Sequence, residues 1–432
     1  MLFLVNALNF FDRQVIAAVV EPLRREWSLT DAQIGAIGTA FTLLYAVVGL
    51  PLGRLADTWS RRALLFAGCF LWTSMTALSA LATGFRTLFA ARLAVGVGEA
   101  VCAPASTSLL ADLFPSERRG RATSVFMLGL PVGLGLSYAV SGAVAQAWGW
   151  RAAFLVAGLP GVLVALLCLT LPEPPRGAAE GAAVGSRRRP GSVVALLART
   201  PTFLWIVVSG ALHNFNMYAL SLFLPALLTR RHGLDLREAG IVSGLVFGVV
   251  GGIGMLLGGW TSDRAAAWRA DGRLLTCAVG LGLAVPMATA FLGQAPGARA
   301  STTALLCLTV LLLYLYYAPV YATLQDIVEP SLRGTAMAVY FFAMYLLGAS
   351  LGPWGTGLLS DALAARAAAE SGALLVDERA RAVGLHQALY VVPVLSALLS
   401  AVLFAASRTV ERDRAALRDW ISLTTKDLHE SS

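Results

Sequence analysis

The sequence predicts an all-α membrane protein with twelve transmembrane helices, arranged as two pseudo-symmetric six-helix bundles. Three observations lead to this prediction. Of the 432 residues, 57% are hydrophobic and only 13% are charged, whereas roughly 25% of the residues in soluble domains are charged. Apolar stretches of about 18 residues or more recur along the whole chain. Features of the first half also return in the second half in the same order.

Twelve apolar stretches are long enough to cross the hydrocarbon core of a bilayer. The predicted spans are residues 2–20, 33–53, 63–83, 86–111, 120–146, 152–172, 202–228, 239–261, 273–293, 302–328, 332–359 and 385–406. Because these spans are strung along the whole chain, a soluble enzymatic domain has no room to form. No nucleophile–base pattern appears, and the cysteines and histidines are too scattered for a metal site. We therefore expect neither an enzyme nor a metal or cofactor.

The distribution of positive charge predicts how the chain is oriented. The loops after spans 2, 4, 6, 8 and 10 with the adjoining span ends, together with residues 407–432, carry 20 of the 33 Lys and Arg residues. The loops and span ends on the other side carry 11, and Arg13 and Arg92 lie in the middle of spans. The positive-inside rule then places both termini in the cytoplasm. Because the net charge of +8 is spread over loops, we expect no nucleic-acid partner. We also expect a monomer.

Residues 173–201 interrupt the apolar pattern with prolines, small residues and a run of arginines. We interpret them as a cytoplasmic linker between one bundle at residues 1–172 and another at residues 202–406. Residues 407–432 form a cytoplasmic tail in which apolar and charged residues alternate, and this pattern favours an amphipathic helix on the membrane surface.

The two halves match at an offset of about 205 residues. The matched segments are residues 28–35 (SLTDAQIG) with 233–240 (GLDLREAG), residues 53–57 (GRLAD) with 258–264 (GGWTSDR), and Asp112 and Arg119 with Asp326 and Arg333. Parallel six-helix repeats are a transporter architecture, in which the substrate site lies between the halves near the midplane.

Four charged residues lie deep inside predicted spans, at least six residues from either end: Asp12, Arg13, Arg92 and Glu99. Each costs at least ~2.5–3.5 kcal/mol at the centre of a membrane helix, so such groups pair with one another or face a watery path. Arg92 and Glu99 share one helix face. Asp12 and Arg13 point about 100° apart, and we expect Asp12 to reach Arg92. The alternative is a permanent ion pair that fastens helix 1 to helix 4.

Several motifs resemble one transporter family. Residues 53–62 (GRLADTWSRR) resemble the helix 2–3 motif of the major facilitator superfamily. Residues 9–14 (NFFDRQ), 91–100 (ARLAVGVGEA), 347–353 (LGASLGP) and 359–361 (LSD) resemble its spinster branch. Spinster-like carriers export lysolipids, including sphingosine 1-phosphate and lysophospholipids, and bacterial relatives resemble proton-coupled versions.

The resemblance implies a proton-coupled secondary transporter of an amphipathic anionic lipid, working by alternating access in a bacterial inner membrane. It needs a proton gradient and no cofactor. An alternative is a carrier of soluble organic anions or drugs with the same fold. A receptor or scaffold that transports nothing is a different class, and the buried charges argue against it.

We expect a proton-coupling group and a substrate site among the helices that line the cavity in this superfamily. Glu99, Asp12 and Arg92 are the proton-coupling candidates. Arg13 suits an anionic headgroup because its guanidinium binds phosphate bidentately and keeps its charge. The substrate candidates beside Arg13 are Asn6, Asn9 and Phe10 on helix 1, Asn214, Asn216 and Tyr218 on helix 7, and Tyr314, Tyr317 and Tyr321 on helix 10. Aromatic stripes such as this tyrosine stripe are more often packing than ligand contacts.

Residues 53–62 and Asp112 predict a cytoplasmic gate. Its members are Gly53, Asp57, Arg61, Arg62 and Asp112. Gly53 permits close backbone approach, and Asp57 suits a helix N-terminus of the other half, near Ser331. Arg61 is expected to pair with Asp112, whereas Arg62 also fits ordinary positive-inside charge.

Overall fold

The computed structural model describes residues 1–175, 197, 199–329 and 332–430, and these parts of the chain contain helices and no strand. Eleven helices in them are long and apolar enough to cross a membrane, or twelve when the bent pair α1–α2 is counted as one span. The predicted all-helical membrane fold is therefore confirmed. The first span is bent, because α1 and α2 meet at an angle of 47°.

The N-terminal bundle contains the first six spans, several of which are built from two segments. Its helices are α1 (Leu2–Ala18), α2 (Val20–Trp27), α3 (Asp31–Thr58), α4 (Arg61–Leu78), η1 (Ser79–Leu81), α5 (Phe85–Glu99), α6 (Cys102–Leu113), α7 (Ser116–Met127), α8 (Gly129–Trp148) and α9 (Trp150–Cys168). A capping box starts α3: the Thr30 hydroxyl accepts from the Gln33 amide, and the Gln33 side chain accepts from the Thr30 amide.

The C-terminal bundle repeats this plan. Its helices are α11 (Pro201–His232), α12 (Leu236–Gly244), η2 (Leu245–Val250), α13 (Gly251–Trp268), α14 (Gly272–Leu292), α15 (Arg299–Tyr314), α16 (Tyr317–Asp326), α17 (Arg333–Ala343), η4 (Met344–Ala349), α18 (Leu351–Glu370), α19 (Glu378–Ala388) and α20 (Val391–Glu430). A second capping box, formed by Asp235 and Glu238, starts α12 at the position that the sequence repeat assigns to Thr30.

Helix interruptions mark the middle of the membrane region. The fourth span breaks after Glu99, and the tenth breaks after Tyr314, at the corresponding place in the second bundle. The eighth and eleventh spans each contain a π-helical segment, η2 and η4. Such wide turns are frequent at functional sites because they free backbone groups and redirect side chains.

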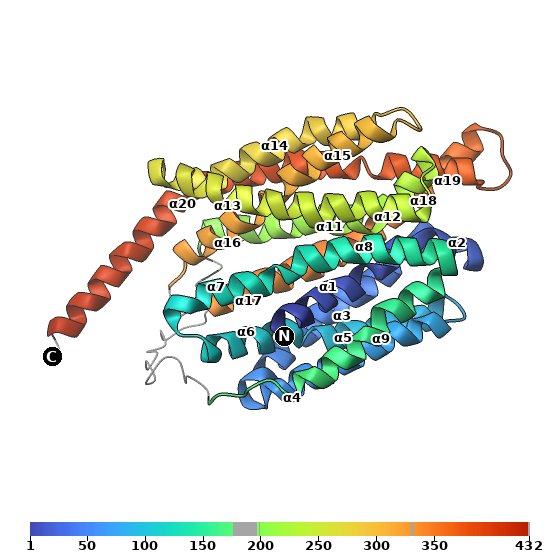
Figure 1. Ribbon diagram of the computed structural model, residues 1–432. Helices are drawn as coiled ribbons and strands as arrows, with labels where there is room; N and C mark the ends of the chain where they lie inside the picture. The colour runs from blue at the N-terminus through green and yellow to red at the C-terminus, as the bar shows by residue number, and fades with distance from the viewer. Residues whose placement is uncertain (176–196, 198, 330–331, 431–432) are drawn as a thin grey trace.

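The two bundles lie side by side, with the blue-to-green N-terminal helices below the mostly yellow-to-red C-terminal helices in Figure 1. We call the end that carries Glu173 and Arg333 the linker end, and the end that carries Asp31 and Arg230 the opposite end. Residues 176–196 and 198, which make up most of the predicted linker, lie outside the described residues.

The bundles touch towards the opposite end along two helix pairs. A Cβ on Gly35 of α3 would collide with the carbonyl oxygen of Pro353 in α18, and one on Gly240 of α12 would collide with that of Tyr138 in α8. At the linker end, by contrast, no atom of the described residues lies within 4 Å of a Cβ built on Gly53. The close approach that we predicted for Gly53 is therefore not made in this conformation.

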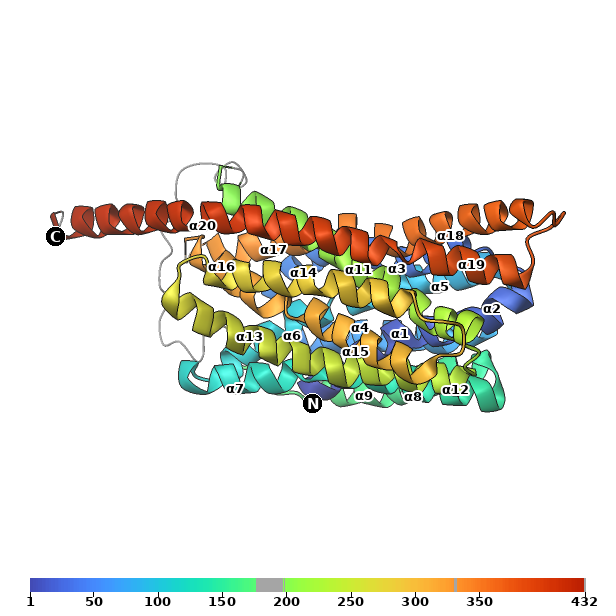
Figure 2. The same ribbon diagram turned by 90° about the horizontal axis from the view of Figure 1, so that it is seen from above.

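The last helix, α20, is 40 residues long and extends beyond the bundles at the linker end, as Figures 1 and 2 both show. The predicted tail from residue 407 to Glu430 continues this helix without a break. Asp413 fixes it to the start of the C-terminal bundle, because its carboxylate accepts from the backbone amide of Thr202 at 2.9 Å.

Candidate functional site

Arg13 of α1 lies at the interface between the two bundles. Its Nε and Nη2 donate to Oε2 of Glu99 at 3.2 and 3.0 Å, and Nη2 also donates to Oδ1 of Asn9 at 3.2 Å. Its Nη1 donates to the hydroxyl of Tyr218 in α11 at 3.3 Å. Glu99 is fully buried and Arg13 is 5% exposed. One charge-assisted network therefore joins α1 and α5 of the N-terminal bundle to α11 of the C-terminal bundle.

Aromatic rings surround this guanidinium. Its central carbon lies 4.8 Å from the ring centre of Phe10, 4.7 Å from that of Phe41 and 5.1 Å from that of Tyr45, distances at which a cation is attracted to the ring face. Tyr345, on the π-helical segment η4, contacts Tyr45 with ring centres 4.9 Å apart. Both bundles thus contribute to an aromatic wall next to one fixed positive charge.

A small cavity adjoins Arg13. It is lined by Arg13, Gln14, Ile16, Gly38, Phe41, Thr42 and Arg92 from the N-terminal bundle and by Tyr218, Ser221, Leu222 and Pro353 from the C-terminal bundle. The cavity lies between the halves, where parallel-repeat transporters hold their substrates.

Asp12 and Arg92 do not form the ion pair that we expected. Arg92 Nη1 donates to the backbone carbonyl of Asp12 at 3.4 Å. Neither carboxylate oxygen of Asp12 has a hydrogen-bond partner in the described part of the chain. The pair that forms instead is Arg13–Glu99, because α1 directs Arg13 towards the broken end of α5 and turns Asp12 into its own bundle, beside Thr76 and Arg92.

Two predicted substrate residues face their own bundles and not the cavity. Asn6 donates to the carbonyl of Phe126 in α7 at 2.8 Å, and Asn216 donates to the carbonyl of Val392 in α20 at 3.1 Å. Asn214, which donates to the carbonyl of Gly210 on its own helix, is two residues from Asn216. Residues two apart lie about 200° apart around a helix, so one polar stripe could not include both.

The three predicted tyrosines of the tenth span, which consists of α15 and α16, also differ in their surroundings. Tyr314 is buried and packs its ring on Gly251 of α13, so it faces its own bundle. Tyr317 and Tyr321 are half-buried, with ring centres 6.0 Å apart. They continue the aromatic wall and remain substrate candidates.

The predicted gate cluster is present at the linker end but lies within one bundle. Arg61 pairs with Asp112, as predicted, and also donates to the carbonyl of Pro174 at 2.6 Å. The exposed Arg62 reaches Glu173 through its backbone amide at 3.3 Å. These partners all belong to the N-terminal half, so the cluster fastens α4, α6 and the segment after α9 to one another.

The expected contact of Asp57 with the other half lies outside the described residues, as does position 331 near which we placed it. Its role as a gate residue stays a prediction.

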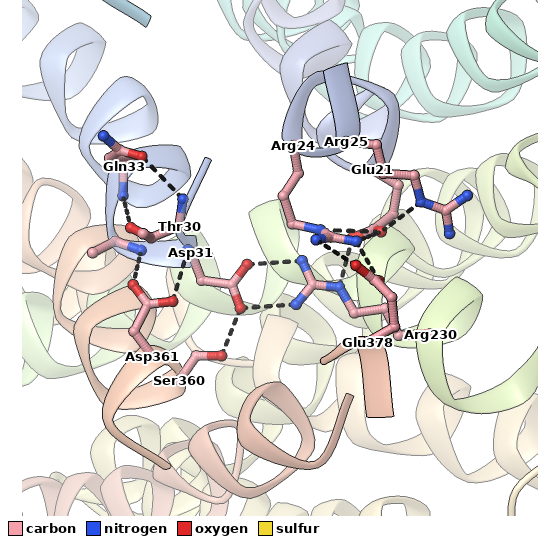
Figure 3. Close-up of polar contacts among 11 residues, drawn as sticks. Glu21, Arg24, Arg25, Thr30, Asp31, Gln33, Arg230, Ser360, Asp361 and Glu378 are labelled. Carbon is pink, nitrogen blue, oxygen red and sulfur yellow. Dashed lines mark hydrogen bonds and ion pairs between the residues drawn. The ribbon is translucent and has the colours of Figure 1, made fainter. Parts of the chain in front are cut away.

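A second polar network joins the two bundles at the opposite end (Figure 3). Arg230 of α11 donates to both carboxylate oxygens of Asp31 at 2.7 and 2.8 Å and to Glu21 at 2.6 Å. Ser360 of α18 donates to Asp31 at 2.6 Å, and the Asp361 carboxylate accepts from the Asp31 amide at 2.9 Å. We call these five residues the opposite-end lock.

Burial gives this lock its strength. Asp31, Glu21 and Arg230 are all at most 3% exposed as side chains, so removing one partner would leave an uncompensated buried charge, a loss of roughly 3–5 kcal/mol. Asp361 additionally accepts from the first amides of α3, where the helix dipole favours an anion.

Residues 2–353 match the family model described as Major Facilitator Superfamily. The chain belongs to the major facilitator superfamily. An MFS-type efflux pump of Mycolicibacterium smegmatis is 34% identical over 370 residues, covering 84% of this chain and 83% of the relative. Protein spinster homolog 1 of Homo sapiens is 32% identical over 380 residues, covering 83% and 72%. The sphingosine-1-phosphate transporter SPNS2 of Danio rerio is 29% identical, covering 83% and 74%.

Solved structures agree with this assignment. The crystal structure of a bacterial homolog to the human lysosomal transporter Spinster, in an inward-facing and unoccupied conformation, matches with a TM-score of 0.86 and 28% identity, covering 96% of this chain and 97% of that chain. The predicted membership of the spinster-like branch is confirmed.

Sequence reasoning about this superfamily member missed the opposite-end lock and part of the aromatic wall. Asp31 lies in the repeated segment 28–35, and Asp361 lies in a segment that resembles the spinster branch. Charged residues near loops are usually exposed to solvent, so we did not expect these two to join the bundles. Phe41, Tyr45 and Tyr345 have no polar pattern around them, so only the fold brings them to Arg13.

Proposed function

We propose that this protein is a proton-coupled secondary active transporter that moves an amphipathic anionic lipid, of the lysophospholipid or sphingosine 1-phosphate kind, by alternating access. The observation that carries the proposal is the Arg13 guanidinium, held between Glu99 of one bundle and Tyr218 of the other. A guanidinium binds a phosphate bidentately and keeps its charge at any physiological pH. Each chain supplies both halves of the site, so the protein acts as a monomer.

Alternating access is supported by the unequal ends of the molecule. The Asp31–Arg230 pair closes the opposite end, while Gly53 at the linker end is uncovered. The loops at the linker end carry most of the arginines, so we infer that this end faces the cytoplasm of a bacterial cell. The conformation is then inward-facing, like that of the solved homolog.

Coupling follows from competition for Arg13. An anionic headgroup that binds Arg13 displaces the Glu99 carboxylate, which is fully buried. An unpaired carboxylate is costly in that position, so Glu99 takes up a proton as the substrate binds. When the substrate leaves, Glu99 releases the proton and returns to Arg13. Asp12 and Arg92 act on Glu99 from inside the bundle.

A lipid is favoured over a fully polar substrate by the aromatic wall. Phe10, Phe41 and Tyr45 offer apolar surface directly beside the charge, which suits an anion that carries an acyl chain. A relative named as a sphingosine-1-phosphate transporter supports the same class.

A second candidate is the efflux of drugs or soluble organic anions. It is favoured by the relative that is named as an MFS-type efflux pump and is 34% identical. It uses the same Arg13 site and predicts transport of anions without an acyl chain.

The test is uptake of radiolabelled lysophospholipid, sphingosine 1-phosphate and an aromatic organic anion into proteoliposomes with and without a pH gradient. We expect the parent to accumulate a lysolipid only with the gradient. Accumulation of the organic anion alone would favour the second candidate, and movement of none of the three would refute transport of these classes.

Glu99→Gln tests the coupling step, with Glu370→Gln as its control. Glu370 forms an exposed pair with Arg366, so its loss should leave uptake unchanged. Glu99→Gln should still exchange labelled for unlabelled lipid but should no longer accumulate it. Unaltered gradient dependence in Glu99→Gln would remove Glu99 from the mechanism.

A further inference from the structure

The interior of the N-terminal bundle contains buried polar atoms that have no hydrogen-bond partner among the described residues. They are both carboxylate oxygens of Asp12, the Thr76 hydroxyl, the Trp72 indole N–H, Arg92 Nε and Glu99 Oε1. All five side chains are at most 1% exposed. Leaving one such group unpaired costs about 1–3 kcal/mol, so a concentration of them in one place indicates a binding site.

These side chains come together from three helices. The Thr76 hydroxyl of α4 lies next to the Asp12 carboxylate of α1, and Arg92 and Glu99 of α5 act electrostatically on Asp12. Trp72 lies one turn before Thr76 on the same helix face, and its main chain packs against Gly98, the residue before Glu99. The group therefore lies inside the N-terminal bundle, where Arg92 and Glu99 connect it with the cavity beside Arg13.

The Thr76 hydroxyl differs from its neighbour on the same helix. Thr73 donates to the carbonyl of Cys69, four residues earlier, at 2.8 Å, which is the usual way for a threonine to satisfy its hydroxyl within a helix. Thr76 makes no such bond. Its hydroxyl is thus left available to Asp12.

Building on the proposed proton coupling, we propose that Thr76 and Trp72 are positioning residues that, with Asp12 and Arg92, bind water inside the N-terminal bundle and relay a proton between Asp12 and Glu99. The donors and acceptors are complementary: the indole N–H and Arg92 Nε donate, the carboxylates accept, and a hydroxyl does both. Water with two to four such partners is stable in a buried site. The positive charge of Arg92 disfavours a metal cation there.

The relay moves one proton and changes no other bond. The Asp12 carboxyl gives its proton to the bound water, and the water gives one to Glu99 Oε1, the oxygen that Arg13 does not hold. The reverse transfer restores Asp12. Transfer of the proton towards Glu99 becomes favourable when an anionic substrate binds Arg13 in place of the Glu99 carboxylate.

The charged surroundings of Asp12 are few. Arg92 and Glu99 face it from α5, and the Cys69 thiol faces it from α4. Of the other helices packed on α1, α8 has no charged residue, and α9 and α6 have only Arg151 and Asp112, which pair with Glu26 and Arg61 near the two ends of the bundle. The charged residues of α7 and α12 lie near the starts of those helices, at the linker end and the opposite end. On α11, His213 stacks on Tyr316 of the C-terminal bundle, and residues 230–232 lie at the opposite end. The pH response of this site therefore belongs to Asp12 and Glu99 jointly.

Infrared difference spectroscopy tests the relay in the full-length protein reconstituted in liposomes. Spectra are recorded between acid and alkaline pH, and Asp12→Asn identifies the carboxyl C=O band of Asp12. We expect the band to move to higher frequency in Thr76→Val and Trp72→Phe, because the carboxyl loses a hydrogen bond. It should stay in place in Thr76→Ser and in the control Thr73→Val, whose hydroxyl bonds to its own helix.

The relay is overturned if Asp12 shows no titrating band, if the band of Thr76→Val is unchanged, or if Thr73→Val moves it equally. Gradient-driven lipid uptake gives a second readout. Thr76→Val should shift its pH midpoint by about 0.5–1 pH unit, the equivalent of one weak hydrogen bond, without changing the KM for lipid. If the parent ignores the gradient, the proposed function fails, while the infrared result still decides whether the polar site exists.

Discussion

Adjacent charges on α1 have different surroundings because a helix turns neighbouring side chains about 100° apart. Arg13 faces the other bundle and meets Glu99 and Tyr218. Asp12 faces α4 and α5 and receives no hydrogen bond from the described residues. A substrate can therefore reach the arginine directly, whereas the aspartate can respond only through Glu99 and Arg92.

Removing the hydroxyl of Tyr218 should weaken anion binding modestly. Tyr218→Phe deletes one acceptor for Arg13 and leaves Glu99 and Asn9 in place. A loss of about 0.5–1.5 kcal/mol, or roughly two- to tenfold in Kd for lysophospholipid, is expected. Binding titrations of the purified protein measure it.

The control is Tyr314→Phe, whose ring packs on Gly251 and should leave Kd unaltered. Equal effects of the two substitutions would contradict the assignment of Tyr218 to the site.

At the scale of elements, α3 and the span formed by α17, η4 and α18 control closure. The carbonyl of Ser350, just after the π-helical segment η4, accepts from the Thr39 hydroxyl of α3, and the next contact towards the opposite end is Gly35 on Pro353. At Gly35 the contact is with main-chain atoms of Pro353 and Trp354, which cannot change rotamer to make room for a larger residue.

Gly35→Ala should therefore favour the conformation that is open at the opposite end. Its methyl group would collide with the Pro353 carbonyl, and overpacking of this kind costs about 1–3 kcal/mol in the closed state. Gly49→Ala on the same helix meets open space and serves as the control. Spin-label distances across the opposite end should lengthen in the first variant alone, and matching distributions in both variants would refute this role for the contact.

The start of α4 gives a pH-dependent prediction. Burial raises the pKa of Glu173, but hydrogen bonds from Ser60 and from the amides of Arg61 and Arg62 outweigh burial and hold the pKa below its ordinary value of 4.5. Its stabilisation is therefore fully present above that ordinary pKa and is lost as the pH falls through the lowered pKa.

Glu173→Gln should lower the free energy of unfolding by about 1 kcal/mol near neutral pH, as the loss of a helix cap does. The difference from the parent should vanish in acid. Thermal unfolding in detergent across a pH series measures it, and a difference that persists at the lowest pH would contradict the account.

At the scale of the whole molecule, the sequence predicted the features that its internal repeat and its hydropathy pattern determine. The twelve spans, the two halves and the position of Asp12, Arg13, Arg92 and Glu99 inside spans follow from local pattern. The partners did not follow, because rotation of each helix about its axis is set by packing. We therefore expected an ion pair between Asp12 and Arg92, which does not form. We also placed Asn216 in the cavity, although it faces α20.

The opposite-end lock should hold the inward-facing state. Arg230→Gln leaves Asp31 as a buried carboxylate without an arginine, while Glu21 keeps its pairs with Arg24 and Arg25. An uncompensated buried charge costs roughly 3–5 kcal/mol, which is enough to shift a two-state equilibrium strongly. Spin labels at the exposed Trp148 and Leu375, one in each bundle, should report a longer distance than in the parent.

Arg151→Gln is the matched control, because the Arg151–Glu26 pair is exposed and lies within one bundle at the same end. A parent-like distance in Arg230→Gln would show that the lock does not decide which end is open.

The central claim is that an anionic substrate and Glu99 compete for Arg13, and proton exchange on binding tests it most directly. Lysophospholipid is added to the purified protein in weakly buffered detergent solution that contains a pH indicator. The account predicts that the parent takes up protons as lipid binds, whereas Glu99→Gln binds lipid without proton uptake. Binding by the parent without proton uptake, or equal uptake by Glu99→Gln, would contradict it.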